Sequence, residues 1–265
     1  MNSLKKIVWG GALAALFLIG AFILWGLGQY QTPILMYHQI MITNDQRLIL
    51  NSVSPASFDK QMKFIVDNHY NVLSFDEFIK AKKAGKPLAR NSVVIQFDDG
   101  YDNNYTEAFP ILKKYGLPAL VYVVADKVGT PGYISWDQAR QMHAEGFSIG
   151  AHTRTHAYLP DLTYDKAYDE IAEGKKIIES HLGSRVDYFA YPSGGFNQQA
   201  KDIAKAAGFQ AAVSTNRGLD KSNQDLFELK RIRIKDTDHG IALRAKLSGY
   251  YNLFRKSKQG YWFNF

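Results

Sequence analysis

The stretch Val-Val-Ile-Gln-Phe-Asp-Asp-Gly-Tyr-Asp, from Val93 to Asp102, joins an apolar run to two adjacent carboxylates and a glycine. The apolar residues predict a buried strand, and Asp98 and Asp99 follow it directly. Neighbouring like charges oppose each other's ionisation, so such a pair points to a bound cation or a shared proton. Asp-Gly is also a common turn dipeptide, so a solvated turn is the alternative interpretation at this point.

Short apolar runs alternate with longer amphipathic stretches on both sides of this segment. The predicted strands are Ile34–Tyr37, Val93–Phe97, Ala119–Val124, Phe147–Gly150, Tyr188–Ala190, Phe209–Val213 and Leu229–Ile234. The predicted helices are Pro55–His69, Asn103–Tyr115, Trp136–Glu145, Thr163–Leu182 and Gln198–Ala207. Strands that alternate with helices indicate an α/β fold with a parallel sheet, either open or closed into a barrel. In such folds the chemistry lies at the C-terminal ends of the strands, where Asp98 and Asp99 stand.

The composition limits the kinds of site this chain can build. It has 265 residues, 46% of them hydrophobic, and no cysteine. Disulfides and thiolate ligands are therefore excluded, and any metal must be held by His, Asp or Glu. The formal charge is +7, yet no nucleic-acid-binding motif stands out, so nucleic acid is not an expected partner. An anionic cell-wall polymer or a membrane surface would suit the same charge.

The N-terminus predicts a membrane anchor. Lys5 and Lys6 precede an uncharged run from Ile7 to Gly28, and roughly 20 apolar residues suffice for a helix to span a bilayer. A cleaved signal peptide is the alternative, because small residues at Gly26 and Gly28 suit cleavage. The lysines favour a cytoplasmic N-terminus. We therefore expect a single-pass cell-membrane protein, with residues 1–30 as the anchor and residues 31–265 as one extracytoplasmic domain.

A second motif follows another predicted strand. The stretch Ser148 to His156 places His152 and His156 four residues apart, a spacing at which both imidazoles can reach one ion. It differs from the metalloprotease helix motif, because Thr153 stands where that motif requires Glu. Two structural histidines are the alternative interpretation.

A third motif, Phe189 to Asn197, contains Pro192 and two glycines and predicts a tight loop whose backbone amides can face a ligand. An ordinary strand-to-helix turn would explain it equally well. The pair Tyr37-His38, after the first strand, carries no signal by itself.

Taken together and in this order, the motifs resemble the polysaccharide deacetylase (NodB-homology) family, carbohydrate esterase family 4. The resemblance runs from about Pro33 to about Ile234. Gln96 to Gly100 looks like the family's Thr-Phe-Asp-Asp-Gly motif, and His152 to His156 matches its His-Ser/Thr-x-x-x-His motif. The resemblance implies a distorted (β/α) barrel with about seven strands.

The resemblance also implies roles for individual residues. Asp99, His152 and His156 would hold a divalent metal, zinc in first place, with cobalt, nickel or manganese as alternatives. Asp98 would be the general base. The backbone amide of Ser193 would stabilise the oxyanion, and Tyr191 and Pro192 in the same loop would help to bind substrate.

Two departures from the family pattern concern the groups that move protons. Ala190 stands where many relatives have an Arg that orients the base. The segment Glu228 to Ile234 lacks the His that usually serves as the general acid. Relatives that act on poly-N-acetylglucosamine and some cell-wall glycans share both departures and carry a Tyr-His pair on the first strand. The resemblance therefore implies that His38 is the general acid, since barrel closure would bring the first strand beside the last.

The predicted function is metal-dependent N-deacetylation of N-acetylglucosamine in a cell-wall or exported polysaccharide. Peptidoglycan, a wall-polysaccharide linkage unit and poly-N-acetylglucosamine are open as substrates. The expected partners are that polysaccharide and the membrane; the sequence names no protein partner. The alternatives are an O-acetyl esterase using the same site and an inactive glycan-binding module, although a binding module would not need the base Asp98.

Overall fold

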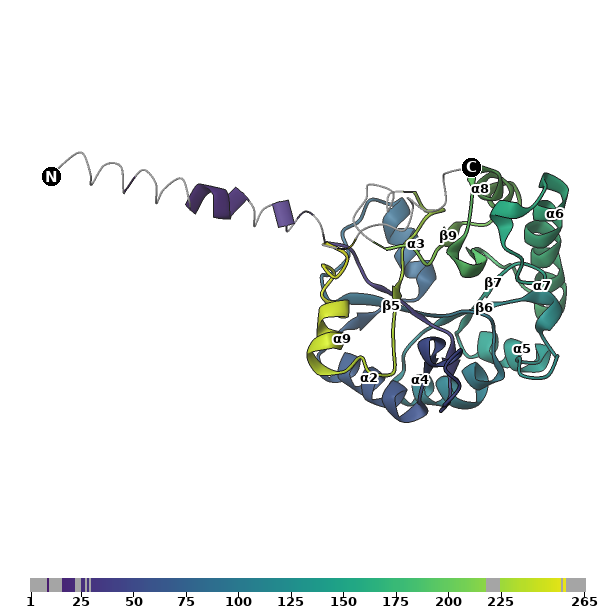
Figure 1. The fold of residues 1–265 in the computed structure, drawn as a ribbon, viewed down its shortest axis with the longest axis horizontal. Helices are drawn as coiled ribbons and strands as arrows, with labels where there is room; N and C mark the ends of the chain where they lie inside the picture. The colour runs from purple at the N-terminus through teal and green to yellow at the C-terminus, as the bar shows by residue number, and fades with distance from the viewer. Residues whose placement is uncertain are drawn as a thin grey trace. The chain divides into compact units, whose positions relative to one another are not determined.

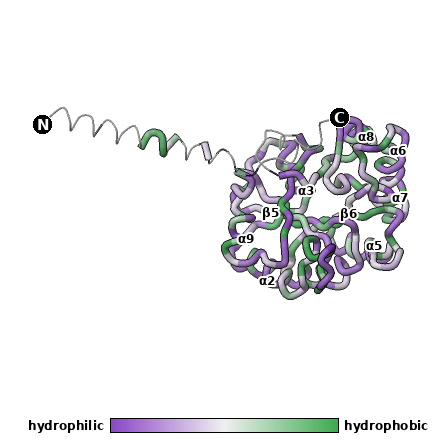
Figure 2. The backbone as a smooth tube through the Cα atoms, viewed as in Figure 1, coloured by the Kyte–Doolittle hydropathy of each residue, from purple (hydrophilic) through white to green (hydrophobic). Residues whose placement is uncertain are grey.

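The computed structural model describes residues 30–217, 225–253 and 255, and residues 9, 16–21, 25, 26 and 28 nearer the N-terminus. By its contacts the chain divides into two units, Met1–Gln31 and Thr32–Phe265 (Figure 1). Residues 16–21 are helical and apolar (Figure 2). Among the described residues no helix is long and apolar enough to cross a membrane. Much of the predicted span Ile7–Gly28 lies outside them, so the anchor stays a prediction.

A parallel sheet forms the centre of the second unit. Its strands lie in the order β10-β1-β5-β6-β7-β8-β9. Their bounds are β1 Ile34–Tyr37, β5 Ser92–Phe97, β6 Leu120–Val123, β7 Ser148–Ala151, β8 Tyr188–Ala190, β9 Ala211–Val213 and β10 Ile232–Arg233. A further strand, β4 (Asn71–Val72), pairs with the start of β5. The seven strands along this path agree with the predicted number.

One segment near the C-terminus joins the two edges of the sheet. Leu229 bridges Val213 in parallel, and the amide of Ser214 donates to its carbonyl at 2.9 Å. A few residues later the amide of Ile234 donates to the carbonyl of Met36 in β1 at 3.1 Å. The sheet therefore curls round, so that β1 and β10, the first and last strands of the sequence, are neighbours. The resemblance implied this closure.

Helices surround the curled sheet (Figure 1). Their bounds are α2 Pro55–Asp67, α3 Phe75–Lys83, α4 Phe109–Tyr115, α5 Trp136–Ala144, α6 Tyr164–Tyr168, α7 Gly174–Leu182, α8 Gln198–Ala206 and α9 Gly240–Leu247. Local signals start several of them: the side chains of Ser54, Ser74 and Ser135 each accept a hydrogen bond from the first turn of α2, α3 or α5. The prediction missed α3, α9, β4 and the paired short strands β2 (Gln39–Ile40) and β3 (Ser52–Val53).

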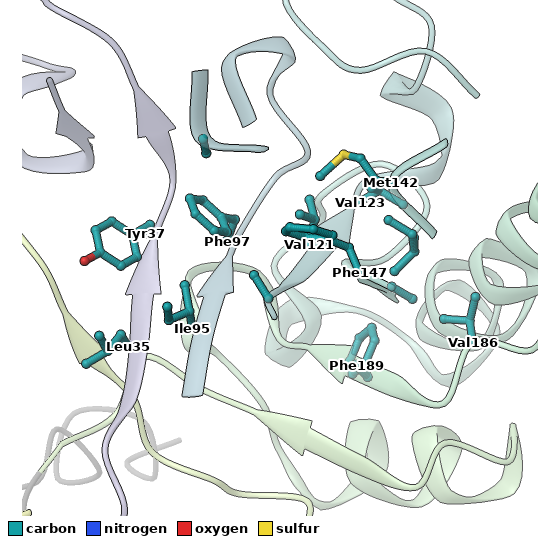
Figure 3. Packing of buried hydrophobic residues seen from close by; sticks show 14 of the residues in the cluster. Leu35, Tyr37, Ile95, Phe97, Val121, Val123, Met142, Phe147, Val186 and Phe189 are labelled. Atoms are coloured by element: carbon teal, nitrogen blue, oxygen red, sulfur yellow. The ribbon is translucent and has the colours of Figure 1, made fainter. Parts of the chain in front are cut away.

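Alternation along the strands builds two apolar layers. Leu35, Ile95, Phe97 and Val121 belong to the large cluster that includes residues of the surrounding helices (Figure 3). Their neighbours along the strands, among them Val94, form a second cluster together with Phe75 and Phe78 of α3. Successive side chains of a strand face opposite ways, so Val94, Gln96 and Asp98 share one face. Along that face the sheet changes from apolar to polar toward the C-terminal end of β5.

Candidate active site

Each predicted site residue follows the C-terminal end of a strand. His38 follows β1, Asp98 and Asp99 follow β5, His152 and His156 follow β7, and Ser193 follows β8. The strands are parallel and neighbouring, so these ends lie along one edge of the curled sheet.

Asp99, His152 and His156 form a group that could hold one metal ion. Oδ1 of Asp99 lies 3.4 Å from Nε2 of His152 and 3.2 Å from Nε2 of His156. All three ligand atoms lie within 4.8 Å of one another. The spacing of the two histidines predicted that both imidazoles could reach one ion, and the family resemblance implied Asp99 as the third member.

The donor atoms of this group fit a cation. Oδ1 of Asp99 is buried and accepts no hydrogen bond, which is rare for a buried carboxylate oxygen. Nδ1 of His152 lies 2.7 Å from the carbonyl oxygen of Ala190. A carbonyl can only accept, so Nδ1 carries the proton, and in the neutral ring Nε2 presents its lone pair toward Asp99. One carboxylate oxygen and two imidazole nitrogens suit zinc and leave positions open for substrate.

Electrostatics within the group agree with a carboxylate that is ionised. Burial raises the pKa of Asp99, but the nearby imidazoles outweigh burial and hold its pKa well below the usual range. Burial lowers the pKa of His152, whereas Asp99 and Asp98 raise it to a net value above the usual one.

The backbone around the site is strained. Asp99, Thr153, His156 and Ser193 all have left-handed backbones, with φ of 74°, 61°, 73° and 55°. Such conformations cost on the order of 1–3 kcal/mol each for residues other than glycine, and they persist where the surroundings fix them. The only other such residue in the described chain is His69, so this strain concentrates at the site.

Glu170 holds the loop that carries the two histidines. Its carboxylate accepts from the amide of Arg154 at 3.1 Å, the amide of Thr155 at 2.9 Å and the hydroxyl of Thr155 at 2.6 Å. Glu170 lies in a π-helical turn, Asp169–Glu173, that interrupts the predicted long helix between α6 and α7. The interruption of the helix therefore coincides with the residue that fixes the loop.

Asp98 is buried beside this group and is held by Arg231. Nη1 and Nη2 of Arg231 donate to Oδ1 and Oδ2 of Asp98 at 2.6 and 2.7 Å, and Nε donates to the carbonyl of Ser214 at 3.1 Å. Burial raises the pKa of Asp98, but Arg231, with His152 and His38, outweighs burial and lowers its pKa below the ordinary value. Asp98 is therefore ionised at neutral pH, as a general base must be.

Sequence reasoning missed Arg231. The prediction recognised that Ala190 replaces the expected arginine, but it assigned no other guanidinium to the base. The alternation Arg-Ile-Arg-Ile from 231 to 234 was the available signal. Ile232 and Ile234 belong to the large apolar cluster that includes residues of the surrounding helices. Arg231 and Arg233 must then face the other side, toward Asp98.

His38 lies beside the base. Its Nε2 is 3.9 Å from Oδ2 of Asp98, and its carbonyl accepts from Nδ2 of Asn104 at 2.6 Å. Burial lowers the pKa of the His38 imidazole; Asp98 and Asp99 oppose this effect but do not cancel it.

The loop after β8 divides between core and site. Ser193 is exposed, and its carbonyl accepts from the hydroxyl of Thr215 at 3.1 Å. A Cβ built on Gly194 would lie 2.2 Å from that hydroxyl, so the close approach requires glycine. Pro192 is buried at the base of the loop, and the Tyr191 side chain packs in the core with its hydroxyl bonded to the carbonyl of Phe227 at 3.1 Å. Of these residues, Ser193 is the one exposed to a ligand.

Comparisons with known proteins agree with this geometry. The family described as polysaccharide deacetylase matches residues 85–212. YxkH of Bacillus subtilis strain 168, which is assigned to the polysaccharide deacetylases, is 32% identical over 80% of this chain and 75% of its own length. A poly-β-1,6-N-acetyl-D-glucosamine N-deacetylase of Staphylococcus aureus strain MRSA252 is 27% identical over 70% of this chain and 68% of its own.

Solved structures are similar over most of the described fold. The Streptococcus pyogenes deacetylase PplD, solved in complex with acetate, has a TM-score of 0.75 and 30% identity, and the match covers 82% of this chain and 97% of PplD. IcaB from Ammonifex degensii has a TM-score of 0.73 at 24% identity, over 83% and 97% of the two chains, and supports the fold.

The Arg231–Asp98 pair predicts a pH-dependent loss of stability in Arg231→Met. Removing one partner of a buried ion pair costs about 3–5 kcal/mol because the other charge is left uncompensated. The lowered pKa means that folding favours ionised Asp98. The contribution of ionised Asp98 to the free energy of unfolding is therefore present above the unfolded-state pKa of about 3.9. This contribution is lost as the pH falls through the lower folded-state pKa of Asp98.

Urea unfolding of wild type and Arg231→Met from pH 7 to pH 3 measures this effect. We expect the difference in unfolding free energy to be largest at neutral pH and to shrink below about pH 4. A difference that does not depend on pH would show that Arg231 acts by packing alone.

Proposed function

This chain belongs to the polysaccharide deacetylase family, carbohydrate esterase family 4, and from that premise we propose that it removes acetyl groups from N-acetylglucosamine in a cell-wall or exported polysaccharide, with a divalent metal. The observation that carries the proposal is the placement of an ionised, arginine-held Asp98 directly beside the group formed by Asp99, His152 and His156. A base next to a metal group is the arrangement that hydrolysis of an acetamide requires.

Asp99, His152 and His156 would hold the metal, with zinc the first choice for this donor set. When bound, such an ion polarises an acetyl carbonyl and makes a water molecule more acidic. The hydrogen bond from His152 to Ala190 keeps the imidazole oriented toward the carboxylate of Asp99.

Asp98 would take the proton of the attacking water. Arg231 keeps this carboxylate ionised and fixes both its oxygens, so the base needs no reorientation before it acts. The backbone amide of Ser193, held in place by its left-handed conformation, would donate to the oxyanion that forms from the acetyl carbonyl.

His38 would protonate the leaving nitrogen. An amine leaves an amide at a useful rate only when it is protonated, so a second group must supply a proton while Asp98 holds the first. His38 lies 3.9 Å from Asp98, directly after β1, and β1 pairs with β10, the strand that begins just after Arg231. Its lowered pKa makes its protonated form a stronger acid, although that form is less populated at neutral pH.

The place of action follows from the N-terminal sequence. We propose that the segment before residue 31 anchors the protein in the cell membrane and that the deacetylase domain, residues 31–265, works outside the cytoplasm. The support is the uncharged run Ile7–Gly28 after Lys5 and Lys6. Detection of free amines on the glycan would distinguish N-deacetylation from removal of O-linked acetyl groups.

The metal group predicts one tightly held divalent ion in the full-length protein. His152→Ala should lose that ion and the deacetylase activity together, because two ligands hold a divalent cation much less tightly than three. Elemental analysis after dialysis measures the metal content. Equal metal content in wild type and His152→Ala would place the ion elsewhere.

The base predicts a separation of metal binding from turnover. Asp98→Asn keeps the shape of the side chain but cannot accept a proton, so kcat should fall by about 10²–10⁴-fold while the metal content stays normal. Release of acetate from a chitooligosaccharide measures kcat. An active Asp98→Asn protein with normal metal would show that another group is the base.

The acid predicts a dependence on the leaving group. His38→Ala should slow hydrolysis of the acetamide by about 10²-fold or more, yet change hydrolysis of nitrophenyl acetate much less, because nitrophenolate leaves without a proton. Wild-type amide hydrolysis should also fall as the pH rises through the pKa of His38, which lies below its ordinary value. The ester reaction should not show this decline.

Asn104→Ala provides the matched control for His38. The side-chain amide of Asn104 donates to the backbone carbonyl of His38 and not to its imidazole. A packing defect should slow both substrates equally in either variant. Equal losses on the amide and the ester in His38→Ala would contradict the assignment of His38 as the acid.

A further inference from the structure

A basic cavity lies beside the catalytic groups, and the reaction described above leaves it without a role. Its volume is about 410 Å³, within the range of roughly 300–1,000 Å³ that is typical of ligand pockets. Its walls come from residues after β9, from β10 and the loop beyond it, and from α9 and the residues after it. Six cationic side chains line this space: Arg217, Arg231, Arg233, Lys235, Lys246 and Arg255.

Within the described residues, two of these six cations have an ion-pair partner. Arg231 pairs with Asp98, and Lys246 pairs with Asp238. Asp238 is the one carboxylate among the described residues that line the cavity. Within the part of the chain that the structure describes, no ion pair is recorded for the other four cations. Like charges around one space repel each other, and an anion bound there relieves the repulsion.

The cations are arranged from the inside of the cavity outward. Arg231 and Lys246 are buried, Arg233 is half-buried, and Arg217 and Lys235 are exposed. Burial lowers the pKa of the Arg233 guanidinium; Asp98 raises it, and Arg231 lowers it further. A charged ligand can thus enter past exposed cations and reach a less hydrated one, where an ionic hydrogen bond is stronger.

Two residues connect this cavity to the reaction. Arg231 lines it and donates to both oxygens of the base Asp98. Thr215 also lines it and donates to the carbonyl of Ser193 in the oxyanion loop. A group held in the cavity is therefore one side chain away from both the base and the loop, so it can belong to the same glycan whose acetyl group reacts.

We propose that the cavity is a subsite for an anionic group, a phosphodiester or a carboxylate, carried by the glycan next to the N-acetylglucosamine that loses its acetyl group. The inference rests on the proposed function and names the substrate class. Guanidinium groups bind both kinds of oxyanion in bidentate fashion. A neutral homopolymer of N-acetylglucosamine offers these cations nothing, and its deacetylated amines would be repelled.

Three substrates with the full-length protein test this inference: chitotriose, an N-acetylglucosamine–N-acetylmuramic acid oligosaccharide, and an N-acetylglucosamine oligosaccharide that carries a phosphodiester. Acetate release at low ionic strength gives KM for each. At least one anionic substrate should have a KM about tenfold or more below that of chitotriose, and added salt should reduce the difference. The better of the two identifies the anionic group. Equal KM values for all three would overturn the proposal.

A double variant locates the effect. Arg217→Gln with Lys235→Gln should bring the ratio of the neutral to the anionic KM close to one, and the ratio cancels any general loss of activity. Lys60→Gln with Lys86→Gln removes two charges from exposed positions outside the cavity and should keep the ratio of the wild type. An unchanged ratio in the first variant, or an equal fall in the second, would contradict the assignment.

Direct binding separates this proposal from the proposed reaction. Calorimetry on Asp98→Asn compares chitotriose with the phosphodiester and carboxylate oligosaccharides without turnover. Tighter anionic binding, with no acetate released by the wild type, would support the subsite and refute the reaction. Acetate release without any anionic preference would support the reaction and refute the subsite.

Discussion

The ion pair between Arg231 and Asp98 is the interaction on which both the fold and the site depend. The two residues are 133 positions apart, and both side chains are buried. They meet because the segment that carries Arg231 bonds to β9 at one end and to β1 at the other, next to β5. A buried ion pair contributes little net stability, since desolvation offsets much of the attraction. Its value here lies in keeping a carboxylate ionised at the end of β5.

The same pair explains how two adjacent carboxylates coexist in the site. Asp98 continues the pairing of β5 with β1 through its amide and points to Arg231. Asp99 takes a left-handed backbone instead, and its carboxylate meets His152 and His156. Asp98 therefore has a cationic partner, and Asp99 has two imidazoles of its own. Four left-handed residues at about 1–3 kcal/mol each are a substantial cost for a domain that is stable by roughly 5–15 kcal/mol. The hydrogen bonds of Glu170 and Thr215 are examples of what offsets this cost.

Much of the fold could be predicted because its strands and helices carry local signals. The apolar runs of β1, β5 and β6 and the amphipathic stretches of α2 and α8 were recognised within a few residues of their observed ends. The metal group came from two motifs and a family resemblance. Two-residue strands such as β2 are too short to show a period. The prediction missed α3 although Ser74 and Glu77 form a capping box at its start. The local alternation indicates which way the Arg231 side chain faces, but its pairing with Asp98 exists only once the edges of the sheet meet.

The positive charge near β10 shifts the pKa of both groups that we propose transfer protons, Asp98 and His38. Burial alone would raise the pKa of Asp98, which opposes the ionised state that a base needs. Arg231, with His152 and His38, outweighs burial and lowers the pKa of Asp98, so Asp98 is a weaker base that is ionised at neutral pH. Arg231 and Arg233 also help to lower the pKa of His38, so that its protonated form is a stronger acid but is less populated. One set of cations thus favours a deprotonated Asp98 and a readily released proton on His38, the pair of states that the proposed amide hydrolysis would use. The cations that line the cavity extend the same positive field away from the reacting atoms. A negative group on the substrate would reduce the repulsion among these cations.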